Sequence, residues 1–226
     1  MMDQNTEYFD LYDEVGQPLG RSKARDEVHR DGDWHRSAHV WIVTGLGELL
    51  FQRRGATKDT WPGTLDATAG GHYRAGEGWE AVVREIEEEL GVEVDAAELV
   101  SLGQRRVDSR ELGVVDREIQ DVFVVRRDTP LTAYRLDPAE VDGLAALPIA
   151  QAALLHADVG ARAEARYLAR GGGDPAPLTM TAGDIIPGRA AYLAAVADAA
   201  RALLAGEAVT PLPPDAAVEV IEAGQR

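Results

Sequence analysis

The chain has 226 residues, with 39 acidic against 23 basic side chains and a formal net charge of -16. This charge argues against general binding to nucleic acid polymers or to anionic membranes, because both are polyanions. A small anionic ligand remains compatible with it, since a few basic groups can be held in a pocket. Hydrophobic residues make up 45% of the chain, so it can bury a core and is expected to be globular.

Cysteine is absent from the sequence, which excludes disulfides, a thiolate nucleophile and a cysteine-based metal site. The N-terminal residues are acidic and lack the apolar run of a signal peptide. No stretch approaches the ~18 apolar residues of a membrane-spanning helix. These features predict a soluble, cytoplasmic protein.

Short strands around one helix are predicted in the first two thirds of the chain. β-Branched and aromatic residues at 39–44 and the segment 48–52 flank a glycine turn, which is a hairpin signature. A helix is predicted over 80–90, because Gly91 stands where glycine commonly ends a helix. The other expected elements are strands at 8–15, after the turn at 17–20, and at 65–68, 99–107 and 119–125, and a helix at 149–156.

The composition changes after residue 160. Residues 161–170 and 189–204 are rich in alanine and predict helices, separated by a glycine- and proline-rich segment at 171–177. The residues from Thr210 contain three prolines and are expected to be loosely structured. We therefore predict a domain over 1–160 and a helical extension over 161–226 packed on it. The extension carries no chemical motif; it would add a packing layer, cover a substrate cleft or form a homodimer contact.

Five acids crowd into the predicted helix between Glu80 and Glu89. On a helical wheel of about 100° per residue, Glu85, Glu88 and Glu89 share one face beside an apolar stripe. Like charges at this spacing repel each other, so the face needs either open solvent or a cation. A hard divalent cation such as Mg²⁺, which binds a few carboxylates, water and phosphates, is the simplest compensation. A solvated acidic face without a ligand is the alternative.

A glycine-rich loop precedes this helix and favours the cation. Gly70 and Gly71 end a predicted strand, and the chain returns to the helix start through Gly76 and Gly78. Glycine allows backbone groups to come close to a ligand. A strand, a glycine-rich loop and a helix of carboxylates together would form a cradle for a metal and a diphosphate.

The segment 71–92, which reads GHYRAGEGWEAVVREIEEELGV, resembles the Nudix box, the signature of the Nudix hydrolase superfamily. Every fixed position in the second half of the Nudix box is matched in this chain, by Arg84, Glu85, Ile86, Glu88, Glu89, Gly91 and Val92. Six residues separate Glu77 from Arg84, one fewer than in the family pattern. The spacing of the three glutamates is unaffected, and it is left open whether Glu77 supports the arginine. The resemblance implies an α/β (α+β) fold, a Nudix-type α/β/α sandwich with a mixed sheet.

Residues 34–39 and 50–63 resemble the Nudix subgroup related to isopentenyl diphosphate isomerase. In that isomerase the residues matching Arg54 and Lys58 hold the substrate diphosphate, and an arginine fork with a lysine point charge suits a polyphosphate. The alternative is that both residues lie in a solvent-exposed loop and bind no phosphate. The isomerase uses a cysteine just before the Gly-His of the loop, where this chain has Gly70. Isomerisation needs a proton donor and a proton acceptor, so the missing cysteine argues against it.

The same resemblance bears on the expected roles of four further residues. Glu118 matches a family carboxylate and is expected to be an added metal ligand or a base, unless it is an exposed strand acid. His35 matches an isomerase metal ligand, but an isolated histidine is more often structural, so neither His35 nor His72 is predicted to bind a metal. Glu140 resembles a late acid that some members use as general base; a helix-start acid is the preferred explanation.

The sequence thus predicts a hydrolase dependent on Mg²⁺ or Mn²⁺ that cleaves a small-molecule diphosphate by attack of water at phosphorus. The substrate would be a nucleoside di- or triphosphate or another X-linked diphosphate. Two alternatives stay open: an isomerase-like enzyme or isoprenoid diphosphate hydrolase, and a non-catalytic module that senses a nucleotide. The residues expected to act are Gly71, Glu85, Glu88 and Glu89 as metal ligands, Glu85, Glu88, Glu89, Arg84 and Glu118 in catalysis, and Arg54 and Lys58 in phosphate binding.

Overall fold

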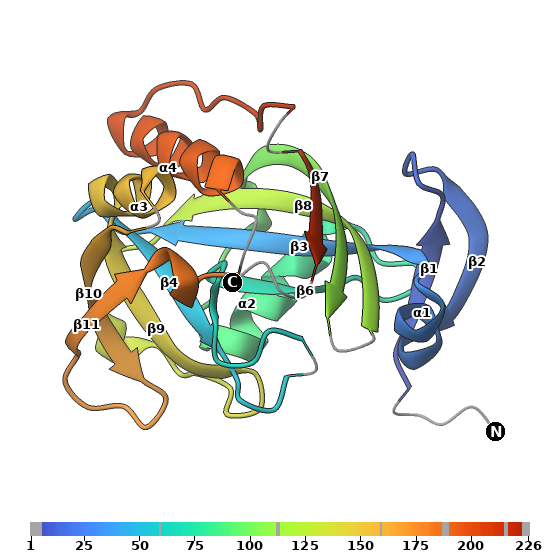
Figure 1. The fold of residues 1–226 in the computed structure, drawn as a ribbon, viewed down its shortest axis with the longest axis horizontal. Coiled ribbons are helices and arrows are strands. Elements are labelled where there is room, and N and C mark those ends of the chain that lie inside the picture. The colour runs from blue at the N-terminus through green and yellow to red at the C-terminus, as the bar shows by residue number, and fades with distance from the viewer. Residues whose placement is uncertain are drawn as a thin grey trace.

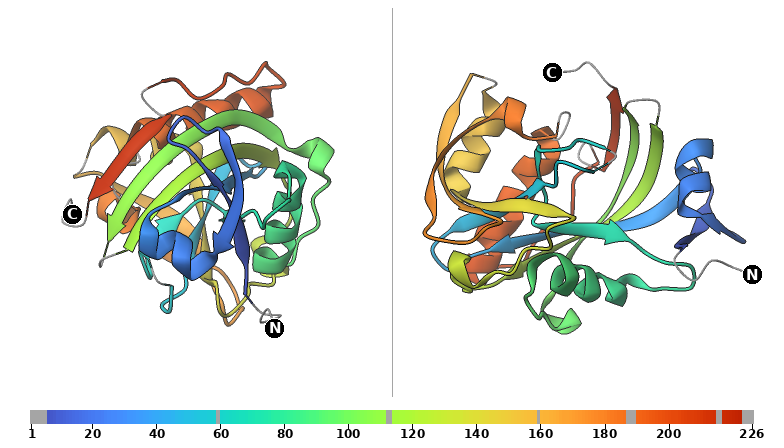
Figure 2. Two further views of the ribbon diagram at one scale, coloured as in Figure 1. Left: turned by 90° about the vertical axis from the view of Figure 1, so that its right-hand side faces the viewer. Right: turned by 90° about the horizontal axis from the view of Figure 1, so that it is seen from below.

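The computed structural model describes residues 6–58, 60–111, 114–158, 160–186, 190–214 and 217–222. In these residues one mixed sheet of 12 strands lies between α2 on one face and α3 and α4 on the other (Figures 1 and 2). The helices are α1 (Arg25–Asp31), α2 (Val82–Leu90), α3 (Ile149–Ala157) and α4 (Ala190–Ala205). The strands are β1 (Tyr8–Tyr12), β2 (Pro18–Ala24), β3 (Trp34–Val43), β4 (Glu48–Arg54), β5 (Leu65–Asp66), β6 (Ala69–His72), β7 (Val100–Glu111), β8 (Val114–Arg126), β9 (Val141–Pro148), β10 (Arg162–Ala169), β11 (Ala176–Thr181) and β12 (Val218–Glu222). The α/β/α sandwich predicted from the sequence is confirmed.

The central strand of the sheet is β3. The strand order is β11-β10-β9-β4-β3-β8-β7-β12, and β3 runs parallel to β8 along its whole length. On its other edge β3 pairs with β6 over residues 37–40 and with β4 at Val43. Side chains from three strands that are distant in sequence therefore meet over the first half of β3.

Alternation along β3 divides the core into two halves, because successive strand residues point to opposite faces of a sheet. Val40 and Ile42 pack with the apolar face of α2, whereas Trp41 and Val43 pack beneath α3 and α4. The same alternation applies to the polar residues of β3, so His35 and His39 lie on the α4 face with Trp41.

The helix α2 forms where the sequence predicts it. A single 3-10 turn, Trp79–Ala81, leads into it, and Gly91 ends it in the left-handed conformation with φ of 63°. Its apolar stripe, Val82, Ile86 and Leu90, is fully buried. This packing places the acidic face of α2 at the rim of β6.

The region after residue 160 differs from its prediction. Residues 161–170 were expected to be helical, but Arg162–Ala169 form β10, between β9 and β11. Buried Ala163 and Ala165 alternate there with exposed arginine and glutamate, a strand period that the helix-favouring composition masks.

The C-terminal part of the chain also contains a strand where a loose segment was expected. Val218–Glu222 form β12, which pairs in parallel with β7. The helix predicted at 189–204 is present as α4, and Arg189 lies outside the described residues. The region after residue 160 thus adds strands to both edges of the sheet, while a division into two parts at residue 160 stays a prediction. No helix in the described ranges is both long enough and apolar enough to span a membrane.

Candidate active site

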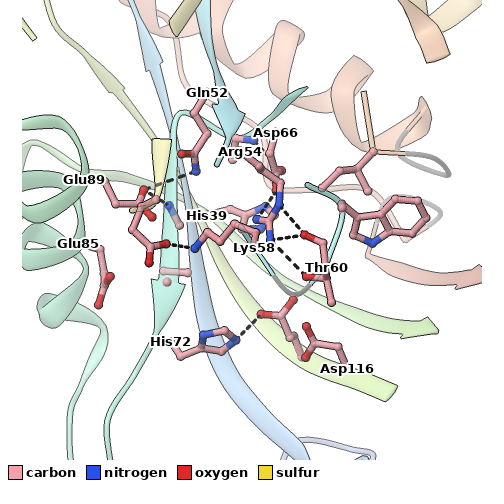
Figure 3. A pocket seen from close by; sticks show the side chains of 18 of the residues that line it. His39, Gln52, Arg54, Lys58, Thr60, Asp66, His72, Glu85, Glu89 and Asp116 are labelled. Carbon is pink, nitrogen blue, oxygen red and sulfur yellow. Dashed lines mark hydrogen bonds and ion pairs between the residues drawn. The ribbon is translucent and has the colours of Figure 1, made fainter. Parts of the chain in front are cut away.

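A cavity of about 730 Å³ opens where β3, β6, β8, α2 and the loop after β4 meet. In Figure 3 the carboxylates of Glu85 and Glu89 lie on one side of Lys58, and His72 and Asp116 lie below it. All the residues predicted to act line this cavity, namely Arg54, Lys58, Gly71, Arg84, Glu85, Glu88, Glu89 and Glu118. The fold thus gathers side chains from four separate parts of the chain.

The carboxylates of α2 reach the cavity across β6, because Gly70 and Gly71 have no side chains there. A Cβ atom on Gly71 would lie 2.3 Å from Glu85 Oε2, and the Gly70 N–H donates to Glu89 Oε2 at 3.2 Å. The Glu89 side chain is 4% exposed, whereas that of Glu88 is 52% exposed. The three glutamates that share a face on the helical wheel therefore differ sharply in environment.

Burial raises the pKa of both inner glutamates. For Glu85 the nearby Arg84 acts in the opposite direction, and for Glu89 burial raises the pKa to about 7 although Lys58 opposes it. A bound cation would favour the charged form of both groups. The carboxylate oxygens of Glu85 and Glu89 and the glycine cradle beside them are the kind of ligands that a hard divalent ion prefers.

Arg84 binds three acids at the entrance to the site. Its guanidinium lies 3.1 Å from Glu77, 2.8 Å from Glu85 and 3.1 Å from Glu88. The shortened segment between Glu77 and Arg84 therefore does not separate the pair, because the 3-10 turn before α2 spans it. Glu77 also accepts the Arg74 N–H at 2.8 Å, which closes the loop.

Arg54, the last residue of β4, and Lys58 in the loop that follows already have partners within the protein. Arg54 donates to the Thr60 carbonyl at 2.8 Å and lies 3.5 Å from Asp66, so its guanidinium fastens the loop that carries Lys58. Lys58 forms an ion pair with Glu140, and burial lowers the pKa of its ammonium. Glu140 lies in a turn before β9, so the prediction that it starts a helix is wrong.

A second group of potential metal ligands lies beside the same cavity and includes His35 and His72, which the sequence-based prediction excludes as ligands. One ligand atom each of His29, His35, His72 and Asp116 lies within 4.8 Å of the others. His35 Nε2 and Asp116 Oδ1 are buried, have no hydrogen-bond partner among the described residues and lie 3.5 Å apart. Burial lowers the pKa of His35 to about 3, which keeps the imidazole neutral, the form that binds metals.

Glu118 stands beside this histidine group, and its side chain is only 14% exposed, so the alternative of an exposed strand acid does not hold. It lies 3.3 Å from His72 Nε2 and accepts a hydrogen bond from Gln120 at 2.6 Å. Although burial acts to raise its pKa, the hydrogen bond and charge of His72 hold the pKa of Glu118 well below its usual value. In the neighbouring Asp116, burial and the charge of Glu118 raise the pKa well above the usual value.

Part of the cavity wall is apolar. Trp61, Val107, Ile186 and Ile221 form one buried cluster, and all four line the cavity. Ile221 comes from β12, so the C-terminal part of the chain builds a portion of this wall. Trp61 has a positive φ of 50°, a strained conformation for a bulky residue, and its indole N–H donates to Ser109 at 3.4 Å.

The family model of the NUDIX domain matches residues 33–169, which include β3, α2 and β8. The chain belongs to the Nudix family. This Nudix chain is similar to an uncharacterized Nudix hydrolase of Clostridium acetobutylicum, with 36% identity over 146 residues, or 63% of this chain and 70% of the relative. It is an enzyme of the Nudix hydrolase type, as the sequence predicted.

Two further comparisons bear on fold and subgroup. An isopentenyl-diphosphate Delta-isomerase of Paenarthrobacter aurescens is 33% identical over 137 residues, which are 60% of this chain and 73% of the isomerase. The crystal structure of a Deinococcus radiodurans protein aligns with a TM-score of 0.53 at 24% identity, and covers 67% of this chain and 89% of that one. The structural likeness shows a shared fold.

Proposed function

We propose that this Nudix hydrolase uses Mg²⁺ or Mn²⁺ to cleave the diphosphate bond of a small organic diphosphate. The observation that carries the proposal is the convergence on one cavity of four groups: the buried Glu89, the largely covered Glu85, the basic Arg54 and Lys58, and Glu118, whose pKa is held well below its usual value. The substrate is a nucleoside di- or triphosphate or another diphosphate linked to an organic group.

The metal would be held by Glu85, Glu89 and the Gly71 carbonyl, with Glu88 at the exposed rim. A bound divalent cation supplies charge neutralisation of the diphosphate and acidifies water. Glu85 is oriented for this role by Arg84 at 2.8 Å, and Glu89 by the Gly70 N–H at 3.2 Å. Glu85 and Glu89 would therefore form the inner part of the proposed site, and the more exposed Glu88 would contribute less to it.

The chain's own residues would then handle the phosphate and the proton. Lys58 exchanges its partner Glu140 for a phosphate oxygen, while Arg54 keeps the loop in place. Glu118 is ionised at neutral pH and can accept a proton from the attacking water. A bond forms between the water oxygen and phosphorus, the bridging P–O bond breaks, and the leaving phosphate departs with its electron pair.

The histidine group is proposed as a second metal position. Three imidazoles and a carboxylate are a donor set suited to Mn²⁺ or Zn²⁺ rather than to Mg²⁺, which prefers oxygen ligands. His29, His35, His72 and Asp116 would hold an ion at this position, and Glu118 lies beside it, 3.3 Å from His72 Nε2.

Isomerase activity, the alternative, is opposed by packing at Gly70. A Cβ atom there would lie 3.0 Å from the Ala38 carbonyl oxygen and 3.2 Å from His39 Cδ2. The chain has glycine where the isomerase has its cysteine, and His39 and the Ala38 carbonyl leave little room for a side chain at that position. The apolar wall favours a substrate that carries a hydrophobic or aromatic group on its diphosphate.

A substrate panel tests the proposal. Nucleoside diphosphates, nucleoside triphosphates and isoprenoid diphosphates are incubated with the protein and Mg²⁺ or Mn²⁺, and phosphate-containing products are measured. Metal-dependent product from at least one of them supports hydrolysis. Tight binding of a nucleotide without any turnover contradicts hydrolysis and indicates a sensing module.

A further inference from the structure

The aromatic ring of Phe9, on β1, packs against all three imidazoles of the histidine group. It lies nearly parallel to the His72 ring, with the centroids 4.9 Å apart and the planes at 18°. It is also nearly parallel to the His35 ring, at 5.3 Å and 15°, while His29 is tilted by 55° at 6.1 Å. Phe9 is 1% exposed, so its ring keeps water from the side of the histidine group that it covers.

This stacking leaves the nitrogen atoms of the imidazoles available. Stacked rings touch through their faces, whereas a metal ion binds a ring nitrogen in the plane of the imidazole. The ligand atoms of the three histidines and Asp116 lie within 4.8 Å of one another. The Phe9 ring can therefore hold the imidazoles without occupying the point at which their nitrogens converge.

Backbone hydrogen bonds fix the strand that carries Phe9. The loop after β6 donates to the Tyr8 carbonyl at 2.7 Å, and the far end of β1 pairs with β3 at Trp34. The N–H of Arg25, the first residue of α1, donates to the Glu7 carbonyl at 2.9 Å. Figure 1 shows β1 and α1 together beside the start of β3. The strand is thus tied to the three elements that carry the histidines.

The packing around Phe9 requires an apolar side chain, and the stacking uses its shape. Alternation along β1 turns Phe9 and Leu11 inward, where they form a small core cluster with Val28 of α1. Any aliphatic residue could fill such a cluster. A flat ring lying parallel to two imidazoles adds contacts that depend on the orientation of those imidazoles.

We propose that Phe9 is a positioning residue whose ring fixes the orientation of His35 and His72, and so holds the histidine group ready for a transition-metal ion. Ligands that are already oriented lose less conformational entropy when the ion binds. Loss of the ring should therefore weaken metal binding although every ligand remains. The inference rests on the second metal position of the proposed function, and it gives the N-terminal strand a part in that site.

Two variants separate the effect of the ring from that of the apolar cluster. Phe9→Leu removes the ring and keeps a bulky apolar side chain. Leu11→Ala is the matched control, because Leu11 is 0% exposed and belongs to the same cluster. This control weakens the packing of the same strand while the Phe9 ring remains.

The first measurement is a titration of the full chain with Co²⁺, followed by visible absorption, which reports the ligands of this ion. Mg²⁺ is kept in excess, so that Co²⁺, which accepts imidazole nitrogen more readily, reports on the histidine group rather than on the glutamates. The wild type and Leu11→Ala are expected to bind Co²⁺ equally. Phe9→Leu should bind it about tenfold more weakly, as is usual when an outer partner of a metal site is removed.

The second measurement uses the metal-free protein and is independent of turnover. Three-bond NMR couplings give the χ1 rotamers of His35 and His72. A single rotamer is expected for each histidine in the wild type and in Leu11→Ala, and averaging over rotamers is expected for at least one of them in Phe9→Leu.

Co²⁺ binding by Phe9→Leu with wild-type affinity would overturn the proposal, and so would an equal loss of affinity in Leu11→Ala. Should Phe9→Leu fail to fold, Phe9→Met removes the ring with a more adaptable side chain and carries the same expectations. If the wild type binds no Co²⁺, the second metal position of the proposed function fails, while the rotamers of the metal-free protein still decide whether Phe9 positions the histidines.

Discussion

The substitution Gly71→Ala tests whether the glycine cradle positions Glu85. A methyl group on Gly71 would lie 2.3 Å from Glu85 Oε2, whereas ordinary contact begins near 3.4 Å. The carboxylate must therefore move by about 1 Å. Displacement of a reacting group by about 1 Å can cost on the order of 100-fold in rate, so kcat/KM is expected to fall by about that factor.

The assay is metal-dependent turnover of the best substrate from the panel, measured across a range of Mg²⁺ concentrations. Gly171→Ala is the control, because nothing lies within 4 Å of a Cβ atom there. Thermal unfolding of both variants separates loss of the site from loss of the fold, since overpacking alone costs about 1–3 kcal/mol. Gly71→Ala with kcat/KM within threefold of the wild type at every Mg²⁺ concentration would refute the reasoning.

Three further substitutions follow from the structure. Glu140→Gln removes the carboxylate that holds Lys58, so an inert diphosphate analogue should bind several-fold more tightly in a titration; weaker binding would argue against the partner exchange. Ile221→Lys places a charge in the apolar wall and should raise KM for substrates with bulky apolar groups by about tenfold, from the burial of one aliphatic side chain, whereas the exposed Val220→Lys should not. Gly70→Cys should lower the free energy of unfolding by about 1–3 kcal/mol in a denaturant titration and produce no isomerase activity; isomerisation by this variant would count against the packing argument.

The carboxylate helix could be predicted because its pattern lies within one segment. The spacing of Glu85, Glu88 and Glu89 fixes their shared face, and Gly91 fixes the end of the helix. Their unequal burial could not be predicted, since β6 and Gln52 of β4 cover Glu89 but not Glu88. The covering strands come from other parts of the chain.

The histidine group shows the limit of sequence reasoning more clearly. His29 lies on α1, His35 on β3, His72 on β6 and Asp116 on β8, so only the pairing of β3 with β6 and β8 brings three of them together. Each one alone resembles an ordinary structural residue. The signal available in the sequence was the match of His35 to a ligand of the isomerase.

The part that Arg54 plays in holding the loop also could not be predicted from the sequence. An arginine near a lysine suggests a phosphate clamp, but the Thr60 carbonyl that accepts from Arg54 belongs to the same loop. Local hydrogen bonds of this kind depend on the path of the loop, which the sequence pattern does not give.

The central claim, hydrolysis by attack of water at phosphorus, is tested most directly by turnover in H₂¹⁸O. The best substrate is hydrolysed by the wild type with Mg²⁺ or Mn²⁺, and the products are analysed by ³¹P NMR and mass spectrometry. The account predicts one ¹⁸O atom in a phosphate-containing product and none in the organic hydroxyl group. Incorporation of ¹⁸O into the organic product, or rearrangement of the substrate without any incorporation, would contradict it.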